Sequence, residues 1–181
     1  LRPAKGHTVF LSAAALISKR FPACRFCIVG EGPLRDDLDR HARALGIADV
    51  LDMPGFISDP LTVLASFDVF VLPSLWEGCP VSLLEAMMLR RPCVASAVGD
   101  VPEILSQGAD GVLVPAGDPH ALAEAICLLL SDPMLRERLG NNARKTALHR
   151  YSASRMVEAH IRFYRTLAAG SPPADVYRAA R

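Results

Sequence analysis

The stretch that most constrains the fold runs from Leu72 to Ser96, together with the strand-forming residues 68–72 that lead into it. It predicts a buried strand, a tight loop of polar residues and glycine, a short apolar helix, and a second buried strand at 92–95. A helix between two strands is typical of parallel pairing, because parallel strands need a long crossover connection. Short apolar strands alternate with helices elsewhere too, so the sequence predicts an α/β domain with a mainly parallel sheet.

The remaining elements follow from hydrophobic spacing and from capping residues. We expect further strands over 25–29, 50–53 and 111–114, and helices from about residue 7, over 34–45 and over 60–66. Residues 98–103 are expected to turn into a helix that ends near residues 107–108, and Asp118, Asp132 and Ser152 open three C-terminal helices. The predicted domain covers residues 1–167, in which 152–167 is the last helix. Residues 168–181, which include Gly170, Pro172 and Pro173, are expected to form a loose tail.

Two carboxylates stand eight positions apart in the central stretch, Glu77 in the loop and Glu85 inside the apolar helix. A charge on a helix that is apolar nearly all round is costly unless something pairs with it. One interpretation is a core helix whose glutamate forms an ion pair with Arg90 or Arg91. The other is that Glu85 binds the hydroxyl groups of a ligand, and the residues alone leave both open.

The start of this helix has the composition of an anion site. Pro80 suits the first helical turn, where its missing N–H has no partner, and the small Gly78 lets a ligand approach the backbone. The free N–H groups near Val81 and Ser82 can then bind a negatively charged group. A ligand with a phosphate at the helix start could therefore offer hydroxyl groups to both carboxylates.

Composition excludes several other classes of protein. The chain has 181 residues, is 51% hydrophobic and carries a formal net charge of +1, which suits one globular domain and argues against a nucleic-acid partner. No apolar run has the length of a membrane span and no start resembles a signal peptide, so we expect a cytoplasmic location. Peripheral contact with an anionic membrane is a weaker alternative. It would use the basic residues Arg136, Arg138, Arg144, Lys145 and Arg150.

The five cysteines are odd in number and scattered. Cys24 and Cys27 form a C-x-x-C pair, but no second pair follows, and positions three apart in a strand face opposite ways. We therefore expect reduced, buried thiols and neither a metal site nor a redox site.

The motifs, taken together, resemble the retaining GT-B glycosyltransferases of the family 4 type, also called glycosyl transferases group 1. The resemblance rests on three motifs: "EG-x-P-x-x-x-x-EAM" from Glu77 to Met87, "PCVAS-x-VGD-x-PEI" over 92–104, and the Lys5-Gly6 pair before the first helix. The resemblance extends from Leu1 to about Leu167. It implies the C-terminal, donor-binding half of a GT-B fold, a Rossmann-like doubly wound parallel sheet.

The resemblance implies that a nucleotide-diphosphate sugar is the donor and that the sugar is transferred with retention at its anomeric carbon. Lys5 matches the family lysine that holds the donor diphosphate. Lys5 and the helix start at Val81 and Ser82 would stabilise the charge on the leaving group, and no metal or other cofactor is expected.

The same resemblance assigns the two carboxylates. Glu77 would hold sugar hydroxyls, with the backbone of Gly78, Cys79 and Pro80 nearby, and Glu85 would hold the ribose hydroxyls. The loop at 54–59 corresponds to the family loop that receives the nucleotide base through backbone groups.

Phe56 and Ile57 are the candidate base-binding residues in that loop. The alternative is that Phe56 is a loop residue that packs on the core.

Two parts of the family pattern fall outside the sequence. The family's first strand, central in a doubly wound sheet, and its phosphate-binding arginine would both lie upstream of Leu1, since Arg2 comes too late in the pattern. We therefore expect a fragment of a longer protein that is less stable than an extended version. Recognition of a glycan or lipid acceptor would belong to the absent N-terminal half, so we expect no acceptor-dependent turnover by this chain alone.

Three functions other than sugar transfer from a nucleotide donor can be compared with the sequence. A glycoside hydrolase needs two carboxylates flanking one bond, with one acting as an acid, and here one carboxylate is beside a helix start suited to phosphate. A receiver-type signalling domain would need an acidic cluster at strand ends, where this chain has Gly, Pro and Ser. A non-catalytic GT-B domain that binds a nucleotide sugar, or that acts as a partner subunit, stays open as the alternative function.

Overall fold

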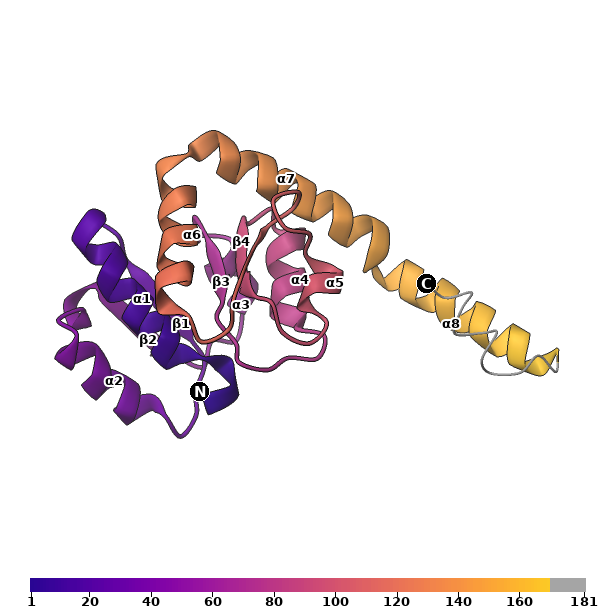
Figure 1. Cartoon of the computed structure of the whole chain (residues 1–181). Coiled ribbons are helices and arrows are strands. Elements are labelled where there is room, and N and C mark those ends of the chain that lie inside the picture. The colour runs from indigo at the N-terminus through magenta and orange to yellow at the C-terminus, as the bar shows by residue number, and fades with distance from the viewer. Residues whose placement is uncertain (170–181) are drawn as a thin grey trace. The chain divides into compact units, whose positions relative to one another are not determined.

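The computed structural model of the protein describes residues 1–169. The chain divides into two compact units, Leu1–Arg144 and Lys145–Arg181. Helices and strands follow one another in the order that the sequence predicts (Figure 1). They are η1 (Pro3–Lys5), α1 (His7–Arg20), β1 (Phe26–Val29), α2 (Arg35–Ala44), η2 (Ala48–Val50), β2 (Leu51–Gly55), α3 (Pro60–Leu64), β3 (Phe70–Leu72), α4 (Val81–Met88), β4 (Cys93–Ser96), α5 (Val101–Ile104), β5 (Val112–Val114), α6 (Pro119–Ser131), α7 (Pro133–Arg150) and α8 (Ala153–Ala168).

All strand pairs of the first unit are parallel, which confirms the predicted α/β class. In β1 and β2, Phe26 lies opposite Leu51, and in β4 and β5, Val94 lies opposite Val112. β4 is buried along its whole length between β3 and β5, as expected of a central strand in a parallel sheet. The strands form two sheets, β1-β2 and β3-β4-β5, where a single doubly wound sheet was expected.

A cavity of about 1230 Å³ is lined by strands of both sheets. It is lined by β1 and by β3, and within residues 1–169 each of these strands pairs with a neighbour on one edge only. Leu1 lines the same cavity. Whether a further strand upstream of Leu1 pairs with these edges stays a prediction.

The core of the first unit lies where α1 packs against α6. Apolar residues recur at helical spacing in α1, and Leu11 and Ile17 are fully buried there against a cluster that includes Leu122 and Leu129 of α6. Asp118 caps α6 by accepting hydrogen bonds from two backbone N–H groups of its first turn, as predicted. This packing fixes α1, and the segment Pro3–Gly6 directly before it carries part of the candidate site.

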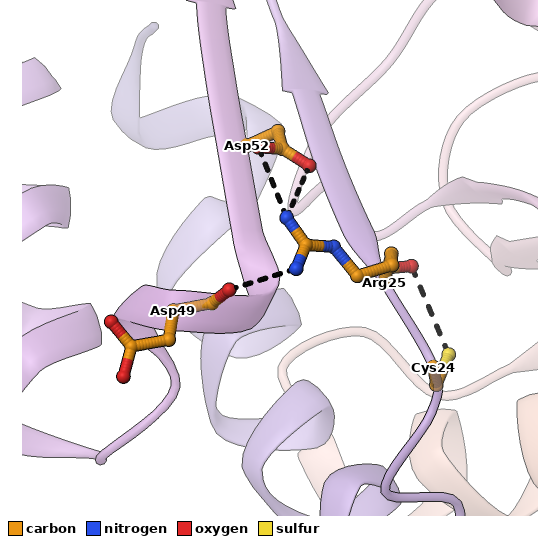
Figure 2. A network of polar contacts seen from close by, with 4 residues as sticks. All are labelled: Cys24, Arg25, Asp49 and Asp52. Atoms are coloured by element: carbon orange, nitrogen blue, oxygen red, sulfur yellow. Dashed lines mark hydrogen bonds and ion pairs between the residues drawn. The ribbon is translucent and has the colours of Figure 1, made fainter.

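The start of β1 is joined to β2 by a polar network on the surface (Figure 2). Arg25 donates from Nη1 to the backbone oxygen of Asp49 at 3.0 Å and from Nη2 to the two carboxylate oxygens of Asp52 at 3.4 and 3.2 Å. Both ends of the ion pair are exposed, so the pair adds at most about 1 kcal/mol to stability. Its effect is to fix the register of the two strands.

The end of α4 is held by α7. Arg90, directly after α4, has a left-handed backbone with φ of 58°, and Arg144 donates to the backbone oxygen of Met88 at 2.5 Å. Gly140 lies so close that a Cβ at this position would stand 2.2 Å from the Arg90 oxygen. The crossing of these two helices therefore needs a glycine.

The second unit is described here over residues 145–169 and contains the end of α7 and all of α8. Ser152 caps α8 by accepting a hydrogen bond from the Arg155 N–H, as predicted. One face of α8 is apolar and exposed, with Met156, Val157, Ile161 and Tyr164. Of the expected tail, residues 170–181 lie outside the described part of the chain. No helix in residues 1–169 is long and apolar enough to cross a membrane.

We predict that a chain extended upstream of Leu1 by a β-forming strand of about six residues is more stable than this chain. The added strand would pair with the free edges of β1 and β3, and the melting temperature should rise by about 2–4 °C for each ~1 kcal/mol that the strand adds to stability. The control is the same extension with alternating prolines, which cannot donate backbone hydrogen bonds. Equal melting temperatures for this chain and both extensions would contradict the prediction.

We also predict that Gly140→Ala lowers the free energy of unfolding by about 2 kcal/mol. Alanine normally stabilises a helix interior relative to glycine by up to about 1 kcal/mol, but here the new methyl group would force the Arg90 carbonyl aside. Denaturant unfolding monitored by circular dichroism measures the change. Glu137→Ala, at an exposed position of the same helix, should be close to neutral, and a stabilised Gly140→Ala variant would refute the described crossing.

Candidate functional site

The candidate site begins where the segment Pro3–Gly6 contacts the loop after β3. The N–H groups of Leu75 and Trp76 both donate to the backbone oxygen of Ala4, at 2.8 and 3.4 Å. Gly6 has φ of 63°, and a Cβ at this position would lie 1.9 Å from the Pro73 oxygen. Only glycine allows this approach, which brings two segments far apart in sequence into contact.

An ion pair joins the two predicted catalytic residues. The Nζ atom of Lys5 lies 2.7 Å from Oε1 of Glu77, whose side chain is only 7% exposed. The hydroxyl of Ser74, which is fully buried, donates to the same oxygen at 2.7 Å. Sequence reasoning placed Lys5 and Glu77 here but missed Ser74, for which the only signal was a serine three residues before the glutamate.

The backbone of Glu77 is also held from the loop after β4. A Cβ on Gly99 would lie 1.8 Å from the backbone oxygen of Glu77, and Gly99 has φ of 52°. The loops that follow β3 and β4 therefore meet at Glu77, at the carboxyl ends of the strands. Ligands of open α/β sheets bind along this edge.

The start of α4 faces this loop. Pro80 is the N-cap of α4 rather than a residue of its first turn, and its carbonyl accepts from the Leu83 N–H at 3.1 Å. The Val81 and Ser82 N–H groups make no backbone hydrogen bond within residues 1–169. They are the open donors that an anion could occupy, as the sequence predicted.

Glu85 has no ion pair or hydrogen bond anywhere in the described chain. Its side chain is half-buried and lines the same cavity as Lys5 and Ser82. The interpretation in which it pairs with Arg90 or Arg91 is wrong, because Arg91 donates to the backbone oxygens of Leu89 and Phe67 instead. A half-buried carboxylate without a partner is costly and is suited to binding a polar ligand.

The loop expected to receive the nucleotide base lies outside this constellation. Phe56 is 75% exposed, so the interpretation in which it packs on the core is wrong. Its N–H donates to Oε1 of Glu31 at 3.4 Å, and Ile57 is half-buried. Neither residue lines the cavity that holds Lys5 and Glu85, so their predicted role stays a prediction.

The cysteines differ in exposure. Burial raises the pKa of the Cys24, Cys27, Cys93 and Cys127 thiols above the ordinary value, which keeps them protonated and unreactive. Cys79 is exposed in the loop between Glu77 and α4. In the described residues, no three His, Cys, Asp or Glu side chains gather as they would around a metal ion.

Comparison with known proteins identifies the class to which this fold and site belong. Residues 1–146 match the family described as "Glycosyl transferases group 1", and the chain belongs to that family. It is 35% identical over 176 residues to the alpha-D-kanosaminyltransferase of Streptomyces kanamyceticus, which covers 96% of this chain and 42% of the relative. It is 33% identical over 177 residues to the phosphatidyl-myo-inositol mannosyltransferase of Mycobacterium leprae, covering 96% of this chain and 46% of the relative. The chain thus spans less than half the length of these relatives.

Solved structures agree with the fold. TarM of S. aureus, crystallised with fondaparinux, alpha-GlcNAc-glycerol and UDP, superposes with a TM-score of 0.83 at 26% identity, covering 87% of this chain and 32% of that one. The C-terminal domain of the group 1 glycosyl transferase LpcC of Francisella tularensis superposes with a TM-score of 0.77 at 27% identity, covering 84% of this chain and 83% of that one. The chain therefore has the fold of the C-terminal domain of a GT-B glycosyltransferase.

We predict that Cys79 reacts with a maleimide reagent at least about tenfold faster than any other thiol of the folded chain. Its exposure sets it apart from the four thiols whose pKa burial raises. Mass spectrometry of timed, peptide-mapped samples measures the rates. Cys79→Ser should abolish the fast phase, and similar rates for all five thiols would show that the loop is not presented as described.

Proposed function

We propose that this chain binds a nucleotide-diphosphate sugar as the donor half of a glycosyltransferase that transfers the sugar, with retention, to a glycan or lipid acceptor. One observation carries the proposal: Glu77, which forms the ion pair with Lys5, and Glu85, which has no partner in residues 1–169, flank the open helix start at Val81 in the sequence, and Lys5, Ser82 and Glu85 line one cavity. The cation and the anion-binding helix start suit the diphosphate of such a donor. The two carboxylates suit the hydroxyl groups of its sugar and its ribose.

The diphosphate is bound, in this proposal, by Lys5 and by the backbone N–H groups of Val81 and Ser82. Lys5 keeps about half of its side chain exposed, at 48%, so its ammonium can reach a phosphate beside Glu77. Positive charge and N–H groups fixed at the leaving diphosphate stabilise the negative charge that develops as the bond to the sugar breaks. The donors come from the chain itself, and the proposal requires no metal.

The carboxylates bind hydroxyl groups, which are donors that an ionised carboxylate accepts well. Glu77 holds the sugar beside the backbone of Gly78, Cys79 and Pro80, of which Gly78 and Cys79 are exposed. Glu85, farther along α4, holds the ribose. The half-buried carboxylate of Glu85 has no protein partner in residues 1–169, which raises the free energy of the ligand-free protein. Hydrogen bonds from the ribose hydroxyls offset this free energy when the nucleotide binds.

The acceptor and the complete reaction go beyond this chain, which spans less than half of its curated relatives. Those relatives are named for a kanosaminyl transfer and for a mannosyl transfer to phosphatidyl-myo-inositol, so membership of the family fits several acceptors. We propose that acceptor recognition lies in an N-terminal half, with the protein cytoplasmic and at most peripherally associated with a membrane. A transfer assay with the extended protein distinguishes this enzyme from a non-catalytic nucleotide-sugar-binding domain.

Calorimetric titration of the chain with a panel of UDP-, GDP- and ADP-sugars tests the donor site. We predict saturable binding of one member and about tenfold or greater weakening by Glu85→Ala. The lost hydrogen bonds to a charged group are worth ~1.5–3 kcal/mol, and 1.4 kcal/mol is tenfold in affinity. UDP-sugars are the first to try, because TarM was crystallised with UDP.

Glu137→Ala is the matched control, since it removes an exposed carboxylate of α7 outside the site. It should leave affinity unchanged. No binding of any member by a folded chain, or equal affinities for wild type and Glu85→Ala, would contradict the donor-site proposal.

A further inference from the structure

We infer that Ser74 is a positioning residue that aims the Glu77 carboxylate at the sugar of the donor, an inference that rests on the proposed function. Ser74 is fully buried and donates from Oγ to Oε1 of Glu77 at 2.7 Å. Lys5 contacts the same oxygen from Nζ, also at 2.7 Å. Two donors of different kinds thus converge on one oxygen atom of the carboxylate.

The other carboxylate oxygen is left for the ligand. Within residues 1–169, the polar contacts of the Glu77 side chain are made by Oε1, and Oε2 has no hydrogen-bond partner. Oε2 is nevertheless not among the fully buried atoms that lack a partner, so it keeps contact with solvent. Oε1 is therefore held by Lys5 and Ser74, while Oε2 keeps some contact with solvent.

Lys5 alone does not fix this orientation. Its side chain is long and half-exposed, and in the proposed function its ammonium also binds the diphosphate, which competes with Glu77 for the same charge. Ser74 has one short, buried side chain and no such second partner. It can hold Oε1 in place while Lys5 turns toward a phosphate.

The backbone around Ser74 is fixed independently of the ligand. The neighbouring residue Pro73 lies against Gly6, and the Leu75 N–H donates to the Ala4 oxygen at 2.8 Å. Gly99 packs on the backbone of Glu77 from the other side. Because the loop is anchored on both sides of Ser74, its hydroxyl has a defined direction, which a positioning group needs.

The competing explanation is that Ser74 only satisfies a buried carboxylate and so stabilises the fold. The two explanations differ in ligand dependence. A residue that acts through Glu77 on the sugar affects binding of the nucleotide sugar and leaves binding of the sugarless nucleoside diphosphate unchanged. A merely structural residue affects both ligands alike.

The experiment compares wild type and Ser74→Ala by calorimetric titration. The ligands are the nucleotide sugar that binds from the UDP-, GDP- and ADP-sugar panel, and its matching nucleoside diphosphate. We expect Ser74→Ala to weaken the nucleotide sugar about tenfold and to change the nucleoside diphosphate less than about twofold. In a Glu77→Ala background, Ser74→Ala should add no further weakening, because its effect passes through that carboxylate.

Ser74→Cys is the second variant, because a thiol has a similar volume and is a weak donor. If Ser74→Ala does not fold, Ser74→Cys must show the same selective loss for the nucleotide sugar.

Equal weakening of both ligands, or no weakening of either, overturns the inference. If Glu77→Ala weakens the nucleotide sugar while the Ser74 variants do not, the inference fails and the proposed function stands. Absence of binding by wild type overturns the proposed function and the inference with it.

Discussion

The contact between the segment Pro3–Gly6 and the loop after β3 is the constraint on which the site depends. A left-handed glycine at Gly6 lets the chain lie directly against the Pro73 carbonyl, and the Ala4 oxygen accepts two N–H groups from the opposing loop. These main-chain contacts bring the backbone of Lys5 close to the loop that carries Glu77, where the side chains form their ion pair. The ion pair forms in a geometry that the backbone has already set, so a bound phosphate can share Lys5 without moving the loops.

The helix α4 shows how one element serves both packing and binding. Its end is held by contacts with α7, where Gly140 lies against the Arg90 carbonyl and the Arg144 side chain donates to the backbone oxygen of Met88. Its start keeps free N–H groups, since the helix needs no further support there. Glu85 lies between the two ends. A helix anchored at one end can tolerate an unsatisfied charge and open donors at the other, which a helix held only by its own propensity could not.

Sequence patterns predicted those features that depend on neighbours along the chain. The order of strands and helices, the parallel α/β class and the Asp118 cap follow from local spacing and capping chemistry, and the structure has all of them. The Ser74 hydrogen bond and the approach of Gly99 to Glu77 depend on which loops meet in space, and no local pattern encodes that. The pairing of Glu85 with Arg90 or Arg91, one of the two interpretations that the residues left open, was wrong for the same reason. The two arginines follow the end of the helix, and Arg91 donates to the carbonyl groups of Leu89 and Phe67.

The unpaired edges of β1 and β3 have a consequence for the behaviour of the chain in solution. Each edge offers a row of backbone N–H and C=O groups beside an apolar cavity, and such edges are templates on which another polypeptide can add a strand. Pairing of two copies of this chain through these edges would compete with ligand binding beside the same cavity. Solubility and oligomeric state would then depend on protein concentration, whatever nucleotide the neighbouring loops accept.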